Sequence, residues 1–369
     1  MRTETLGLTP VSPGSCRSLT RHLWGGDAAP KVYLQAALHA DEMPGAIVVW
    51  HLMDLLDWAE AEGRITGRIC IVPFANPVGL PQWLNGKPQG RQDLETMRNF
   101  NRGYPELAVL AGDALEGRLT GDRAANTKVI RAAFSEALAA QKPRTEGDEL
   151  RLRLMQWSHD ADIVLDLHCD HVALLHFYAS NARPDVTDLL GRATGAALAL
   201  IEDLSGGNAF DEAHTAPWRA LRARFPDHPI DQPTFSTTLE YRGQRDVSDV
   251  QGRQDAENLM AFLGAVGVIA GAPAPAHPPA RETPLAGAGE AFAPQGGIVT
   301  WQHEPGAEVA KGETIAWVSD PTTRRRLPVP APNAGLLFRR EMHPFCLKGQ
   351  GLAHVAGDTP IRQGDLLSD

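Results

Sequence analysis

Cysteine, long apolar runs and excess positive charge are all scarce in this chain of 369 residues. Its 4 cysteines are widely spaced and form no CxxC pair, which excludes a disulfide framework and favours a reducing compartment. No run approaches the roughly 20 apolar residues of a membrane span, and the first residues lack a signal peptide, so we expect a cytoplasmic protein without a membrane partner. The formal net charge of −10 argues against nucleic acid as a partner, because phosphate binding requires clustered lysine and arginine.

The overall composition is that of a globular enzyme. Hydrophobic residues make up 43% of the chain and charged residues 22%, which argues against wholesale disorder. The length can supply a full hydrophobic core and favours two domains over one.

Short apolar, β-prone runs alternate with stretches of helical spacing in the first part of the chain. Residues 31–38, 68–73 and 162–167 are typical of buried strands, whereas 47–59 and 249–270 have the apolar spacing of helices. This alternation predicts an α/β fold, in which a mostly parallel mixed sheet is flanked by helices.

A change of composition after residue 270 predicts a domain boundary. Residues 271–284 begin with a Pro/Ala-rich stretch that is typical of a semi-rigid linker. Beyond it, short β-like segments are separated by glycine and no helical pattern follows, which predicts a small all-β sandwich or barrel. We therefore expect an α/β domain at 1–270, a linker at 271–284 and a β-rich domain at 285–369.

Two histidines and a glutamate follow strand-like runs. His39 and Glu42 come directly after the run at 31–38, so a tight loop can turn both side chains toward one ion, and His168 follows the run at 162–167. A catalytic zinc site needs three ligands of this kind and an open position for water. The three residues are the predicted ligands of one Zn²⁺ ion per chain, although a polar loop and a structural histidine would give the same pattern; Co²⁺ or Mn²⁺ could also serve.

The neighbours of His168 bear on this hypothesis. Asp166, two residues earlier on the same strand face, could accept a hydrogen bond from the other ring nitrogen and fix the histidine tautomer. Cys169 points to the opposite face if the strand continues. His171 and His176 are weaker ligand candidates.

Glu240, which ends the alternating segment 234–239, is the predicted general base. A bound metal lowers the pKa of water toward about 7, and a nearby carboxylate can take its proton. The alternative is a structural salt bridge between Glu240 and Arg242 or Arg245.

A long segment without regular period, residues 78–105, is rich in glycine, proline, asparagine and arginine. Such a loop inside a compact domain is usually functional. Arginine binds carboxylates through paired hydrogen bonds, and an amide or guanidinium can stabilise an oxyanion. We predict that this loop binds a substrate carboxylate, the alternative being a solvated basic loop. Its candidate residues are Arg91, Arg98, Asn101 and Arg102.

These motifs, taken in order, resemble those of the succinylglutamate desuccinylase/aspartoacylase family, within the zinc carboxypeptidase-like clan. The motifs are His39-Ala40-Asp41-Glu42, Asn101-Arg102, His168 and Glu240. The resemblance covers the whole chain and implies that His39, Glu42 and His168 bind zinc. It also implies that Glu240 is the base and that Asn101 and Arg102 bind the substrate carboxylate.

The chain departs from the family pattern at one acid. The family commonly shows Asp-Leu-Asn-Arg, whereas this chain has Asn99-Phe100-Asn101-Arg102, so we expect its substrate preference to differ. The resemblance also implies a further arginine near the metal, which either Arg91 or Arg98 could supply.

The β-rich end has a resemblance of its own. Residues 309–316 and 329–335 look like the two halves of a biotinyl/lipoyl-type barrel-sandwich. A carrier domain needs a lysine in the hairpin between these halves, where this chain has Asp320-Pro321-Thr322-Thr323. We therefore expect no attached cofactor, and a role in shaping the cleft or in oligomer contacts.

The predicted function is zinc-dependent removal of an acyl group from an N-acyl amino acid or a similar small amide that carries a carboxylate. The alternatives are a metallocarboxypeptidase that acts on peptides and a non-catalytic metal- or ligand-binding relative. A pocket closed by the C-terminal domain would favour small substrates, and an open groove would favour peptides. A homo-oligomer is compatible with the sequence.

Overall fold

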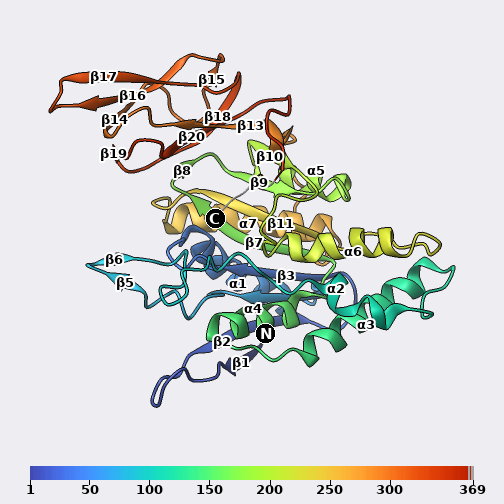
Figure 1. Cartoon of the computed structure of the whole chain (residues 1–369). Helices are drawn as coiled ribbons and strands as arrows, with labels where there is room; N and C mark the ends of the chain where they lie inside the picture. The colour runs from blue at the N-terminus through green and yellow to red at the C-terminus, as the bar shows by residue number, and fades with distance from the viewer. Residues whose placement is uncertain (365, 367–369) are drawn as a thin grey trace.

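A large mixed β-sheet forms the centre of the computed structural model, which describes residues 1–364 and 366 (Figure 1). Its strand order is β1-β2-β4-β3-β7-β11-β9-β10-β12. The strands are β1 Arg2–Gly7, β2 Ser18–Gly25, β3 Lys31–Ala36, β4 Arg68–Val72, β7 Ile163–Asp170, β9 His176–Ala179, β10 Leu198–Ile201, β11 Phe235–Gly243 and β12 Arg281–Pro284.

The middle of the sheet is parallel. β4, β3, β7 and β11 run in the same direction, whereas β9 pairs antiparallel with β11 and begins a second parallel group with β10 and β12. The central strands are buried on both faces, which explains their nearly continuous apolar sequences. The predicted α/β fold with a mixed sheet is confirmed.

Helices cover both faces of this sheet and enclose two separate cores. Along β3, Val32 and Leu34 belong to one core and Tyr33 belongs to the other, because alternate side chains of a strand point to opposite faces. The first core contains residues of α1 Pro44–Ala61, α5 Pro184–Thr194 and α7 Asp249–Ala265. The second contains residues of α2 Leu107–Ala111, α3 Arg123–Ala140, α4 Glu146–Ser158 and α6 Glu212–Arg224. Among the described residues, no helix is both long and apolar enough to cross a membrane.

The C-terminal part consists of two small antiparallel sheets around a core of their own. One sheet has the order β13-β20-β18-β15 and the other β17-β16-β14-β19. Their strands are β13 Ala288–Phe292, β14 Gly297–Trp301, β15 Glu308–Val309, β16 Thr314–Asp320, β17 Arg325–Pro330, β18 Gly335–Arg340, β19 Phe345–Cys346 and β20 Gly351–Ala356. Within the predicted linker, residues 281–284 form β12 at the edge of the large sheet, and a short 3-10 helix, Leu285–Gly287, follows.

A two-residue strand of the large domain joins the C-terminal part. β8, Val172–Ala173, lies directly after β7 and pairs antiparallel with Arg339 and Arg340 of β18. The Leu174 amide also donates a hydrogen bond to the Phe338 carbonyl, with an N···O distance of 2.9 Å. This pairing holds the C-terminal part over the end of the strand that carries His168 (Figure 1).

The start of α1 lies very close to β7. Pro44 occupies the first turn of the helix, where its missing N–H costs no hydrogen bond. A Cβ atom on Gly45 would lie 2.7 Å from the Leu167 Cβ and 2.9 Å from the Leu167 carbonyl oxygen, so only glycine allows this approach. The contact brings the loop between β3 and α1 against the end of β7.

Gly45→Ala is expected to destabilise the protein by about 1–3 kcal/mol, because the added methyl group overlaps the backbone of β7. Thermal unfolding of the two proteins measures the effect. Gly121→Ala is the control, since nothing lies within 4 Å of its Cβ position. Equal melting temperatures for wild type and Gly45→Ala would show that the helix can shift without cost.

Candidate metal centre and active site

His39, Glu42 and His168 are brought together by two neighbouring parallel strands. β3 and β7 pair in the register Ala36 with Leu167, so the loop after β3 lies beside His168 near the end of β7. Within that loop the Glu42 amide donates a hydrogen bond to the His39 carbonyl, with an N···O distance of 3.0 Å. The resulting tight turn places both side chains on the same side.

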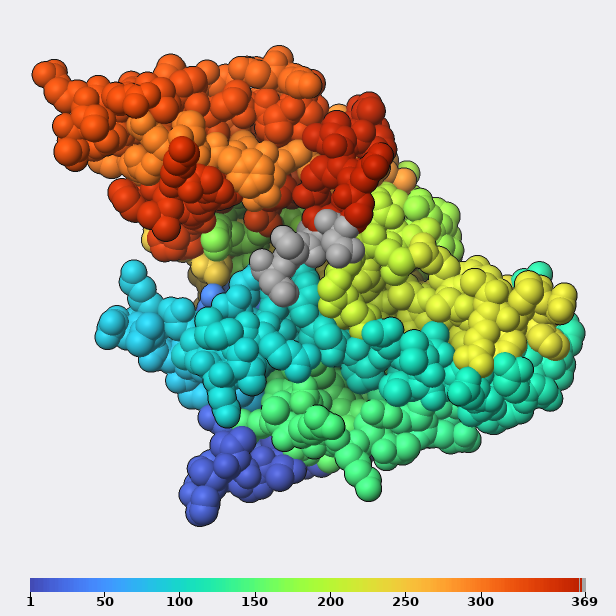
Figure 2. Space-filling model, viewed as in Figure 1, coloured from blue at the N-terminus to red at the C-terminus, as the bar shows by residue number. Residues whose placement is uncertain are grey.

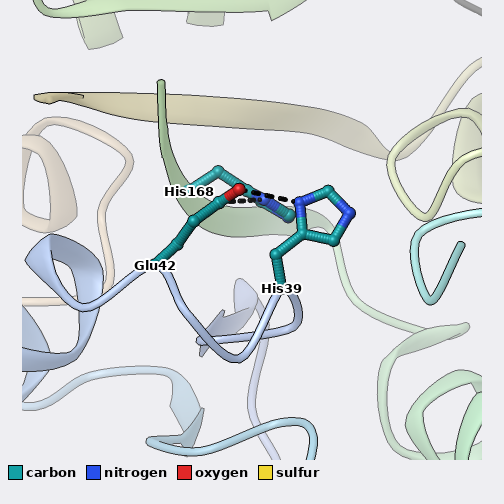
Figure 3. A group of neighbouring side chains, drawn as sticks. All are labelled: His39, Glu42 and His168. Carbon is teal, nitrogen blue, oxygen red and sulfur yellow. Dashed lines mark hydrogen bonds and ion pairs between the residues drawn. The ribbon is translucent and has the colours of Figure 1, made fainter. Parts of the chain in front are cut away.

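The Glu42 carboxylate lies between the two imidazole rings (Figure 3). Its Oε1 is 2.9 Å from the His39 Nδ1 and its Oε2 is 2.8 Å from the His168 Nδ1. All three side chains are buried, and one ligand atom from each lies within 4.8 Å of the others. Among the described residues this is the one group of at least three His, Cys, Asp or Glu side chains with such convergence.

The remaining ring nitrogens are held by acceptors outside the cluster. The His168 Nε2 lies 2.9 Å from the Asp166 Oδ2, which confirms the hydrogen bond predicted for this pair. The Asp166 Oδ1 in turn accepts a hydrogen bond from the Gln35 side chain at 3.0 Å. The His39 Nε2 lies 2.9 Å from the Asn99 Oδ1. With both Nε2 atoms engaged, both Nδ1 atoms face Glu42, and this donor set fits a divalent metal of the zinc class.

Asn99 supports a ligand candidate and is not part of the cavity wall. Its side chain is buried behind His39, and its Oδ1 also accepts a hydrogen bond from the Asn101 amide at 2.8 Å. The partner of the His39 ring is therefore an amide and not an acid. A neutral amide stands where a charged acceptor would make the imidazole more basic.

The pKa shifts of the cluster act on metal binding in different directions. Burial alone would lower the pKa of His168, but Asp166 and Glu42 raise it well above its usual value and favour the protonated ring, whose proton a metal would have to displace. Burial lowers the pKa of His39 and thereby favours the neutral imidazole, which is the form that binds metal. Burial alone would raise the pKa of Glu42, but His39 and His168 together hold that pKa well below its usual range. The carboxylate therefore stays ionised inside the protein.

Glu240 faces the same site from the next strand. In the register of β7 and β11 it lies opposite His168. Its side chain lines the cavity, and its Oε2 is buried without a hydrogen-bond partner among the described residues. Burial, with a contribution from Asp170, raises the pKa of Glu240 well above its usual value. Arg242, the structural partner considered for it, pairs instead with Asp255.

The loop at 78–105 supplies one arginine to the metal cluster. Arg91 is half exposed, and its Nη1 lies 3.4 Å from the His39 Nδ1 and 3.8 Å from the Glu42 Oε1. Arg98 points elsewhere and pairs with Asp148 of α4 at 3.0 Å. Of the two arginines that the sequence left open, Arg91 is therefore the one at the metal cluster, and the placement of Arg98 gives no support for a role in substrate binding.

Asn101 and Arg102, at the end of this loop, both line the cavity. The Asn101 Oδ1 accepts a hydrogen bond from the Phe210 amide at 2.8 Å, which ties the loop to the segment before α6. The backbone of this segment is also held by Arg151, whose guanidinium donates to the Asn99 and Arg102 carbonyls at 2.8 and 2.7 Å. A short hairpin, β5 Trp83–Leu84 and β6 Lys87–Pro88, precedes it.

One cavity of about 420 Å³ joins all these groups. The α/β domain forms most of its wall, and the C-terminal part, which lies over that domain in Figure 2, closes the opposite side. The residues that the C-terminal part contributes are Leu285, Glu290, Arg339, His354, Arg362 and Leu366. Sequence reasoning missed them because no motif connects them to the metal cluster.

The strand pattern holds a signal that could have found two further wall residues. Ser236 and Thr238 lie four and two positions before Glu240 on β11 and therefore share its face. Both line the cavity. His171 and His176 lie outside the metal cluster and face Glu341 and Asp170, at 3.0 and 3.4 Å.

Comparison with known proteins agrees with this architecture. Residues 28–201 match the profile of the succinylglutamate desuccinylase/aspartoacylase catalytic domain. A crystal structure of a protein of this family from Shewanella amazonensis superposes with a TM-score of 0.83 at 25% identity, covering 96% of this chain and 98% of that one. A second, from Shewanella frigidimarina, gives a TM-score of 0.85 at 25% identity and covers 96% of both chains.

A more distant fold neighbour is the ectoine utilization protein EutE (DoeB) from Ruegeria pomeroyi, in a product-bound structure. It has a TM-score of 0.66 at 19% identity, with 97% of both chains covered, and shows likeness of fold alone. No curated protein matches the sequence. The large mixed sheet and its flanking helices carry a buried His/Glu/His cluster that is a candidate metal site. Over residues 28–201 the chain is similar to the catalytic domain of the succinylglutamate desuccinylase/aspartoacylase family.

His168→Ala is expected to reduce bound zinc from near-stoichiometric to a small fraction, because only two of the three converging donors remain. Mass spectrometry of the purified proteins measures the metal content. His171→Ala is the matched control, since His171 pairs with Glu341 outside the cluster. Equal metal in wild type and His168→Ala after metal-replete purification would contradict the site.

Proposed function

We propose that this protein is a zinc-dependent amidohydrolase that removes the acyl group from an N-acyl amino acid or a similar small amide bearing a carboxylate. The observation that carries the proposal is the meeting of three groups in one cavity. These are the His39, Glu42 and His168 cluster, the unpartnered carboxylate of Glu240 and the loop with Asn101 and Arg102.

Each group has a role that follows from its position. When bound at the cluster, a divalent ion would polarise the acyl carbonyl and make water more acidic. Glu240 is placed to take a proton from water and to return it to the leaving nitrogen, and its raised pKa suits both steps. Arg91, beside His39 and Glu42, can stabilise negative charge on the acyl oxygen. Asn101 and Arg102 can hold the substrate carboxylate.

The cover that the C-terminal part forms on one side of the cavity favours a small substrate over a peptide. Its volume of about 420 Å³ lies in the range of small-molecule sites. The C-terminal part closes one side, so the chain of a long peptide would have no exit there. We therefore propose a division of labour in which the α/β domain carries the chemistry and the β-rich domain limits substrate size.

The position of Glu240 also argues against the non-catalytic alternative. A binding protein that kept only the metal cluster would not need a buried, unpartnered carboxylate facing it.

The four cysteines of the chain are free, which supports placement in a reducing cytoplasm.

Glu240→Gln is expected to lower kcat for N-acyl amino acid hydrolysis by roughly 10²- to 10⁴-fold, because the amide cannot accept the proton. Metal content should stay at the wild-type level, since Glu240 is not in the His39, Glu42 and His168 group. The control is Glu257→Gln, on the exposed face of α7, where the carboxylate pairs only with Arg253. A Glu240→Gln enzyme with wild-type kcat would refute the assignment of the base.

An N-acetyl amino acid should be hydrolysed with a kcat/KM at least about tenfold higher than a tetrapeptide ending in the same amino acid, because the closed cavity admits the small acyl group and excludes the longer chain. Amine release from the two substrates at equal concentration measures the ratio. Equal or faster cleavage of the tetrapeptide would favour a carboxypeptidase.

A further inference from the structure

The cavity extends from Glu240 along β11, away from the metal cluster. Ser236, Thr238 and Glu240 share one face of the strand and all line the cavity. In the pairing of β11 with β9, Glu240 lies opposite His176 and Thr238 lies opposite Tyr178. With a strand rise of about 3.3 Å per residue, Thr238 is about 7 Å and Ser236 about 13 Å from Glu240.

Four acidic residues line this extension. Glu202 and Asp203 follow β10, while Asp211 and Glu212 begin α6. Among the described residues, none of the four has a salt-bridge partner that would neutralise it at this wall. All four accept hydrogen bonds from backbone amides, and three of these sets are local. Glu202 accepts from the Asp203 amide at 2.9 Å and Asp203 from the Asn181 amide at 3.0 Å, while Glu212 accepts from the amides of residues 205 and 206.

Asp211 is the acid best placed to meet a ligand. One oxygen accepts a hydrogen bond from the Glu212 amide at 2.8 Å, as the cap of α6. Burial and the nearby Glu212 raise its pKa to about 6, and a hydrogen bond with the Thr238 side chain opposes that rise. Its carboxylate lies at the wall of the cavity and forms no salt bridge within the described part of the chain.

Ser236 gives an independent indication that a ligand belongs here. Its side chain is 3% exposed and faces the cavity, yet its Oγ has no hydrogen-bond partner in the described part of the chain. A buried hydroxyl without a partner is costly, which indicates that a bound group satisfies it.

The chemistry of this wall selects an organic cation. An anion would be repelled by the four carboxylates. A metal ion would need converging ligands, and the described residues show that convergence only at His39, Glu42 and His168. The arginines of the C-terminal wall do not neutralise the acids, because Arg339 is bound to Asp170 at 2.8 Å and Arg362 pairs with none of the four.

We infer that this extension binds the cationic side chain of the amino acid whose acyl group is removed, with Asp211 as the specificity-determining residue. The substrate is then an N-acyl derivative of a basic amino acid. This inference rests on the proposed function and names its substrate class. The hydrogen bond from the Phe210 amide to Asn101 sets Asp211 next to the loop that would hold the carboxylate. One amino acid can thus place its carboxylate at Arg102 and its ammonium group at Asp211.

The test compares kcat/KM of the zinc-loaded enzyme for the Nα-acetyl derivatives of lysine, norleucine and glutamate, which differ in side-chain charge. The lysine derivative should exceed the norleucine derivative by at least about tenfold, because the ammonium group pairs with a partly buried carboxylate. Asp211→Asn should bring this ratio close to unity. Asparagine caps a helix as well as aspartate does, so the variant should fold, and thermal unfolding checks this.

Asp227→Asn, an exposed aspartate beyond the end of α6, is the control and should keep the wild-type ratio. Preference for the glutamate derivative, or an unchanged ratio in Asp211→Asn, would overturn the inference while the proposed function stands. If no derivative is hydrolysed, the proposed function fails. Calorimetric binding of free lysine and norleucine to the zinc-loaded protein then decides the inference, and equal affinities would overturn it.

Discussion

A carboxylate buried between two imidazoles is the constraint on which the rest of this structure depends. A charged Glu42 inside the protein would cost several kcal/mol if it were left unpaired. The two histidine rings and the Cys169 amide, whose nitrogen lies 3.2 Å from the Glu42 Oε2, compensate that cost. This compensation requires the turn after β3 to lie against the end of β7, and Gly45 is the residue that lets the backbone come close enough.

The second constraint is the attachment of the β-rich part. The pairing of β8 with β18 begins two residues after Asp170, so the strand that carries His168 also carries the anchor of the cavity's opposite wall. The ion pair between Arg339 and Asp170 lies at the same junction. The candidate metal cluster and the far wall of the cavity are therefore connected through one short stretch of backbone.

The sequence predicts the parts of this protein whose signals are local. Apolar runs followed by His39 and His168 locate two strand ends, and parallel strands bring such ends to one edge of a sheet. The sequence could not show whether Arg91 or Arg98 lies at the metal cluster. The answer depends on the ion pair of Arg98 with Asp148, which is 50 positions away in the sequence. The position of Asn99 behind His39 could not be predicted either, because the amino-acid sequence of a loop does not show in which direction a side chain points. Arg339 and His354 line the cavity because of the way in which the two domains pack against each other. That packing produces no recognisable motif in the sequence of either domain.

The attachment of the C-terminal part has a consequence for biosynthesis. A ribosome releases the α/β segment, with His39, Glu42, His168 and Glu240, before it has made β18 and the rest of the cavity's far wall. Domains commonly begin to fold in this order during translation. The nascent chain can thus assemble its metal cluster early, but it acquires an enclosed reaction chamber only when β18 pairs with β8. The far wall is therefore the last part of the cavity that the growing polypeptide completes.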